Sequence, residues 1–125
     1  MSAITQMELQ RDKLKSAVDN RASALKLSSN RDFRKLILDE FCEKECARYA
    51  QNSGNPQFDE STRQDCLGMA QAAGHLKRWL SVQVQMGDQA EREIVDLEAA
   101  LEEARLEEAD DDGSFDSNGY EGATD

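Results

Sequence analysis

Apolar residues in the second half of the chain recur at alternating intervals of three and four. The positions are Cys66, Met69, Ala73, Leu76, Leu80, Gln83, Gly87, Ala90, Ile94, Leu97, Leu101 and Ala104. This is the a/d spacing of a coiled coil, and it predicts a helix about 58 Å long at 1.5 Å per residue. Trp79, Val82, Val84 and Met86 widen the stripe in its middle.

Gln83 and Gly87 weaken this stripe, because one is polar and the other has no side chain. Gly87 and Asp88, followed by Glu91, have the residue types that end one helix and cap the next. A single glycine costs a helix only about 1 kcal/mol, however. We therefore predict a continuous or gently bent helix and keep a break at Gly87 as the alternative.

Two shorter helices are predicted before this long one. Residues 3–27 carry a thin stripe of Ile4, Met7, Leu14, Val18 and Leu25, with Arg11 and Arg21 in the intervening positions. A helix with so thin a stripe is stable only when it docks on a partner. Ser28–Asn30 breaks it, and the spacing of Ser29 and Asp32 predicts a capping box for a second helix over about 31–52. That helix has the widest apolar face and is the best candidate for the core.

A turn at 52–57 follows the second helix. Gly54 suits a left-handed position after a helix, and Pro56, the single proline, cannot continue one. The long helix then begins near Asp59 or Ser61, where Ser61 and Gln64 have a second capping-box spacing.

The periodic pattern stops after Ala109. Residues 110–125 are acidic and rich in glycine and serine, which predicts disorder. The predicted fold is therefore all-α, in three parts. Residues 1–28 form an N-terminal amphipathic helix, residues 29–109 a helical hairpin with a coiled-coil extension, and residues 110–125 a disordered acidic tail.

Composition favours extended helices or self-association over a large core. Hydrophobic residues make up 38% of the 125 residues and charged residues 33%, which leaves little apolar surface for a compact domain. The net charge of −11 is uneven: residues 1–36 carry +4, residues 37–106 carry −7 and residues 107–125 carry −8. Nucleic acid is an unexpected partner for the whole molecule, because binding a polyanion requires a basic face.

The sequence predicts a cytoplasmic protein. Its first ten residues lack the apolar core of a signal peptide, and no stretch approaches the 18 apolar residues of a membrane span. Three cysteines fit free thiols in a reducing compartment better than a secreted disulfide framework.

Cys42, Cys46, Cys66 and His75 are the candidates for metal binding. Cys42 and Cys46 share a helix face, and a hairpin would bring Cys46 near Cys66. His75 would point away, about 180° around the helix from Cys66, and the closely spaced cysteine pairs of structural zinc sites are missing. Plain buried thiols are the favoured interpretation, ahead of a Cys46–Cys66 disulfide and of zinc.

No catalytic constellation is visible either. His75 has no nucleophile beside it, and Asp110–Gly113 lacks the length and final glutamate of a calcium loop. Residues 68–74 form a patch of small residues, Gly68, Ala70, Ala72, Ala73 and Gly74, that follows no strand, so the patch predicts close helix packing instead of a phosphate loop. We therefore predict a non-enzymatic protein with no catalytic, cofactor-binding or metal-binding residues and no small-molecule substrate.

Residues 31–109 resemble small helical proteins encoded among the head-assembly genes of tailed bacteriophages. Those proteins have a short Asp-Phe-Lys-Lys-like helix start, a Glu-x-x-x-Arg segment, a proline-containing turn and a long helix that ends in acidic heptads. The matching positions are Asp32, Phe33, Lys35, Glu43 or Glu45, Arg48, Pro56 and the helix after Ser61. The resemblance implies a role in the virion or in its assembly.

The leading functional prediction is a phage structural or virion-assembly factor that acts by helix–helix packing. Its partners would be identical copies, or a capsid, portal or packaging protein. The predicted interface residues are Leu76, Trp79, Leu80, Ile94, Leu97 and Leu101. Two alternatives remain: an acidic inhibitor or adaptor that imitates DNA, and a small DNA-packaging subunit that uses the +4 N-terminal segment.

Overall fold

The fold is all-α, as predicted. The computed structural model describes residues 2–124, and side chains for residues 2–111. Within this range the elements are α1 (Ala3–Ser29), α2 (Arg31–Phe33), the π-helix η1 (Arg34–Glu45), α3 (Cys46–Ser53) and α4 (Glu60–Thr124). From residue 112 on, the predicted acidic tail lies outside the described side chains, so its disorder stays a prediction.

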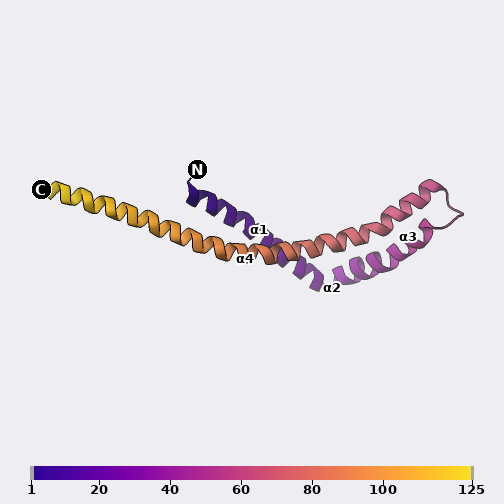
Figure 1. The fold of residues 1–125 in the computed structure, drawn as a ribbon. Helices are drawn as coiled ribbons and strands as arrows, with labels where there is room; N and C mark the ends of the chain where they lie inside the picture. Colours follow the sequence, from indigo (N-terminus) through magenta and orange to yellow (C-terminus); the bar gives the residue numbers. More distant parts are fainter. Residues whose placement is uncertain (1, 125) are drawn as a thin grey trace.

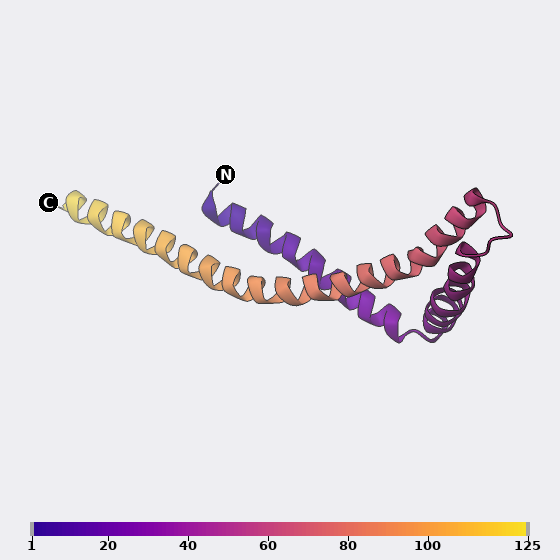
Figure 2. The same cartoon turned by 45° about the vertical axis from the view of Figure 1, so that its right-hand side comes forward.

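Helix α4 is the spine of the molecule, and two shorter helical segments run antiparallel to it (Figure 1). α1 lies along its C-terminal half: Arg105 pairs with Glu8, whereas Asp88 pairs with Arg21. η1 and α3 lie along its N-terminal half, where the Cys46 thiol donates to the Met69 carbonyl oxygen. Figure 2 shows the same arrangement from another side. The chain is thus two helices thick along most of its length.

Asn30 separates α1 from the next helix. Its backbone is extended (φ −72°, ψ 127°), and its side-chain oxygen accepts a hydrogen bond from the Phe33 N–H at 2.9 Å. The predicted capping box at Ser29 is therefore wrong by one residue. Ser29 is still the last residue of α1, and its hydroxyl donates to the Leu25 carbonyl oxygen.

The turn between α3 and α4 also uses other residues than the capping boxes suggest. Asp59 caps α4 by accepting from the Thr62 N–H at 2.7 Å, so the predicted cap at Ser61 is wrong. Gly54 has φ −103° and ψ 4°, so the left-handed conformation predicted for it is wrong as well. The side chain of Asn55 accepts from the Gln57 N–H and tightens the turn.

The second helix has the predicted extent but not the predicted geometry. From Arg31 to Ser53 it is helical throughout, and its middle is a π-helix. Hydrogen bonds from i to i+5 put more than four residues in each turn. Apolar residues spaced four and five apart therefore share one face, which packs on α4, while Leu36 is turned outward and is 64% exposed.

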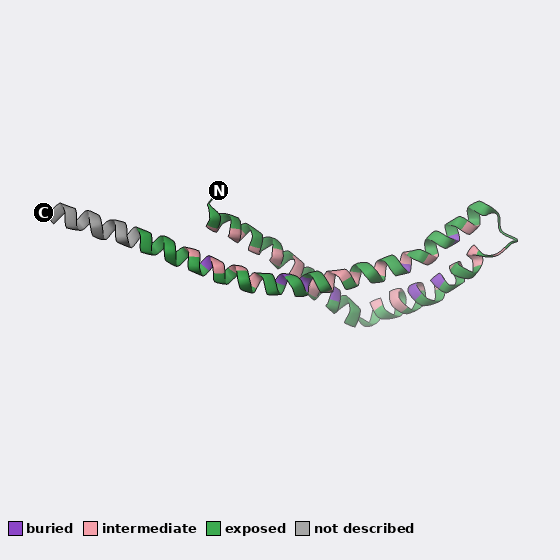
Figure 3. Cartoon of the chain, in the orientation of Figure 1, coloured by how far each residue is buried: buried purple, intermediate pink, exposed green. Residues whose placement is uncertain are grey.

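The stripe predicted on α4 is confirmed as its covered side from Ala73 to Ala104 (Figure 3). It is wrong at Met69, which is 40% exposed. Every stripe position from Ala73 to Ala104 is buried or half-buried, and the helix continues through Gly87 without a break. On α1 the predicted Leu25 is wrong: it is 49% exposed, and Ala24 is buried in its place. A straight helix drifts about 20° per heptad away from a seven-residue repeat, so the contact moves to Ala24 by the third heptad.

Candidate interaction surfaces

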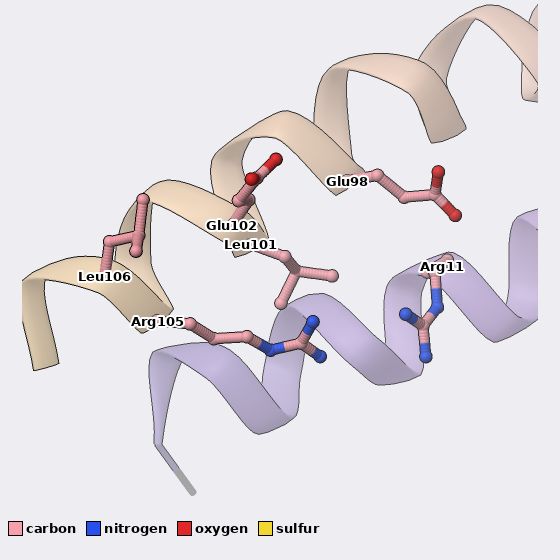
Figure 4. Close-up of a pocket in the computed structure, with 6 residues that line it drawn as sticks. All are labelled: Arg11, Glu98, Leu101, Glu102, Arg105 and Leu106. Atoms are coloured by element: carbon pink, nitrogen blue, oxygen red, sulfur yellow. The ribbon is translucent and has the colours of Figure 1, made fainter. Parts of the chain in front are cut away.

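The surface between α1 and α4 depends on two buried alanines and on a leucine that faces the N-terminal part of α1. Ala24 and Ala90 are buried, and Leu101 is 1% exposed. Leu101 points from α4 toward α1 between the side chains of Arg11 and Arg105 (Figure 4). These side chains line an open groove of about 430 Å³. Leu101 is the side chain that anchors the N-terminal part of α1.

Gly87 lets α1 approach α4 at its closest point. A Cβ atom built on Gly87 would collide with the Cβ of Arg21, whereas Gly68 and Gly74 have open space at the same position. Arg21 crosses α4 at this glycine and donates from one nitrogen to Asp88 (2.9 Å) and Glu91 (2.7 Å). The hydrogen bonds to Glu91 and Asp88 raise the pKa of the Arg21 guanidinium above its ordinary value. Gly87 and its two acidic neighbours therefore form a seat for Arg21 that sets the register of α1.

The hairpin of η1, α3 and α4 has a different core. Cys42, Cys46 and Ala73 are buried at its centre. The partly buried side chains packed around them are Ile37, Leu38, Phe41 and Leu76. Burial is the main cause that raises the pKa of the Cys42 thiol, which keeps that thiol protonated at neutral pH.

The three cysteines are free, buried thiols, and His75 is exposed. Among the described residues, no group of three or more His, Cys, Asp or Glu side chains is arranged to hold a metal ion. The thiols instead act as small apolar side chains between η1, α3 and α4.

The structure divides the predicted interface residues into two groups. Leu101 is buried, and Leu76, Leu80, Ile94 and Leu97 are half-buried. Leu76 packs on the hairpin core, while Leu97 and Leu101 line grooves together with α1 residues. An interface between copies at Leu97 or Leu101 stays a prediction, and it would have to displace α1.

Trp79 stands apart from that set because it is 59% exposed. It borders a groove with Leu27 and Ala24 of α1 and with Leu80 of α4. Leu36 on η1 is also exposed, although it belongs to the wide apolar face predicted for the helix over about 31–52. The paired apolar positions 37–38 and 41–42 fit π-helical spacing and were the signal for this difference.

The fold defines an elongated all-α chain in which one long helix is flanked by two antiparallel segments. No protein-family model, curated protein or solved structure matches it. None of its described helices combines the length and hydrophobicity that crossing a membrane requires.

Proposed function

We propose that this chain is a non-enzymatic assembly protein that packs helix surfaces against identical copies of itself. A role in building a phage virion, as the resemblance implies, is the specific form of this proposal, with a capsid, portal or packaging protein as the final target. The observation that carries it is the amount of surface, and of apolar side chains, that one copy leaves exposed.

The exposed area supports association. A compact monomer of 14.0 kDa exposes about 6,700 Å², whereas this chain exposes 9361 Å². A standard protein–protein interface removes about 800 Å² from each partner. The excess follows from the elongated shape, which leaves the sides of the helices accessible to a partner.

The composition of that surface points the same way. Leu36, Trp79, Met86 and Leu106 are each more than half exposed. Tryptophan is among the residues most enriched in the energetic centres of interfaces, so Trp79 is the residue most suited to anchor a partner.

Analytical ultracentrifugation of the full chain tests this proposal. At tens of micromolar the wild type is expected to sediment above 14.0 kDa, and Trp79→Ala is expected to shift the population toward monomer. Leu67→Ala is the matched control, since Leu67 is exposed on α4 but lies close to the hairpin turn. A wild type that stays monomeric throughout this concentration range contradicts the proposal.

A further inference from the structure

A basic surface, here called the elbow, lies where α1 gives way to η1 beside the middle of α4. Its cations are Lys26, Arg31, Arg34, Lys35, Lys77 and Arg78, all of them exposed. Within residues 2–111, no ion pair involves any of the six. Two exposed carboxylates, Asp32 and Asp39, lie among these cations, and Asp39 lines a groove with Arg31, Arg34 and Lys35. The elbow therefore keeps an excess of positive charge within a protein that is strongly acidic overall.

The elbow also carries exposed apolar side chains. Leu27, Leu36 and Trp79 are 45%, 64% and 59% exposed. Leu27 and Trp79 border one groove. Arg31, Arg34 and Lys35 border a second groove, whose residues follow Leu27 in the sequence. The elbow thus combines an apolar groove at Trp79 with a separate groove lined by cations, and protein interfaces also combine apolar and polar parts.

A surface of opposite charge lies farther along α4, toward its C-terminal end. Residues 98–111, here called the acidic segment, expose Glu98, Glu102, Glu103, Glu107, Glu108, Asp110 and Asp111. Their single cation, Arg105, is already paired with Glu8. Leu106 is 60% exposed and stands within one helical turn of Glu102, Glu103 and Asp110. Leu106 therefore has carboxylates within one turn of its own helix, and Arg11 of α1 and Arg105 line the groove beside it.

We propose that the acidic segment of one copy docks on the elbow of a second copy, so that the chains join head to tail. Leu106 would pack against the apolar groove at Leu27 and Trp79. The carboxylates of the acidic segment would then face the Lys and Arg side chains of the elbow. This inference rests on the proposed self-association and adds its surfaces and direction.

The two surfaces cannot meet within one chain. Trp79 of the elbow and Leu106 of the acidic segment both belong to α4, which is continuous between them. At 1.5 Å per residue this separates them by about 40 Å of helix. A straight helix does not fold back on itself, so the partner must be another molecule. Contacts of this kind use different patches on the two copies and generate a ring or a filament.

Head-to-tail docking makes a definite prediction about salt. Attraction between oppositely charged surfaces is screened over about 8–10 Å at physiological ionic strength, so association is expected to weaken as salt is added. Parallel side-by-side packing would place the acidic segments together, and it would tighten with salt. Tightening in sedimentation at increasing salt would overturn the head-to-tail arrangement.

Charge exchange tests the pairing directly. One full-length variant carries Arg34→Glu and Lys35→Glu on the elbow, and the other carries Glu103→Lys and Asp110→Lys on the acidic segment. Each alone juxtaposes like charges and is expected to weaken association at least about tenfold. An equimolar mixture restores both kinds of contact and is expected to recover wild-type association. Circular dichroism checks that each variant keeps its helix content.

The possible failures are distinguishable. If the wild type associates and the mixture does not recover, the head-to-tail contact is wrong while self-association stands. If the wild type is monomeric, the proposed function fails together with this inference. If the elbow variant associates normally but loses binding to a short DNA duplex, the elbow serves a polyanion and the inference is overturned.

Discussion

The two halves of α4 are covered in different ways. Its N-terminal half packs on η1 and α3 through buried thiols and partly buried aliphatic and aromatic side chains. Its C-terminal half packs on α1 through small residues, one buried leucine and ion pairs at Arg21 and Arg105. The first contact joins segments linked by a short turn, whereas the second joins residues 67 to 97 positions apart.

This difference indicates that the hairpin and the α1 contact have different stabilities. Closing a longer loop costs more entropy, and α1 has a thin apolar stripe with which to offset it. The α1 contact is therefore expected to open before the hairpin does, and its stability is expected to depend on a few residues.

The largest effect is expected at Leu101. Leu101→Ala removes the most buried large side chain of the α1 contact and should lower the free energy of unfolding by about 2–5 kcal/mol. Urea denaturation followed by circular dichroism measures this loss. Val95→Ala is the control for stability, since Val95 is 64% exposed on the same helix and its truncation should change the free energy by less than about 0.5 kcal/mol. Equal effects would show that α1 does not cover Leu101.

A smaller effect, with opposite signs at two glycines, is expected from alanine substitution. Gly87→Ala introduces a Cβ that meets the Cβ of Arg21, and overpacking of this kind costs about 1–3 kcal/mol. Gly74→Ala meets open space and should gain about 1 kcal/mol from helix propensity. Hydrogen exchange should show that Gly87→Ala speeds exchange in α1 and leaves α3 protected. Loss of protection in both would contradict the separation of the two halves.

The smallest effect is expected at Asp59, where the hairpin turn meets α4. Hydrogen bonds from the side chain and the backbone N–H of Thr62 hold the pKa of the Asp59 carboxyl below its ordinary value. A carboxyl with a lowered pKa stabilises the fold above its unfolded pKa of about 3.9, and this contribution is lost as the pH falls through the folded pKa. Asp59→Asn keeps a capping oxygen but does not titrate. Its melting temperature should therefore fall less than that of the wild type between neutral and acid pH, and an identical fall would contradict the capping role.

The long stripe was predictable because it repeats over many turns of helix. Its alternation predicted the covered side of α4 from Ala73 to Ala104, while the continuity at Gly87 was predicted from the small cost of one glycine in a helix. The partner of the stripe was not predictable, because an apolar face does not specify whether it packs within the chain or between copies. Arg21 packs on Gly87 and pairs with Asp88 and Glu91, which favours packing of α1 on α4 within the chain. This fit is evident only when α1 and α4 lie side by side.

Local geometry was predicted less well where several residues compete for one role. Ser29, Asn30 and Asp32 all favour a helix start, and the extended backbone of Asn30 selects it as the cap. The π-helix turns Leu36 outward because more residues fit into each turn than in an α-helix. Exposure of Trp79, which carries the proposed function, depends on how far α1 reaches along α4.

α1 covers the C-terminal half of α4 within a single chain, so the proposed self-association would use other surfaces. The Glu8 and Arg105 side chains approach to 2.9 Å, which makes this pair the most direct probe. A variant with Glu8→Cys and Arg105→Cys, prepared as a mixture of isotopically light and heavy chains, is oxidised and its cross-linked peptides are identified by mass spectrometry. The expected result is a disulfide within one chain, either light–light or heavy–heavy. Abundant light–heavy cross-links would show that α1 packs on the α4 of another copy and would contradict the contact within one chain.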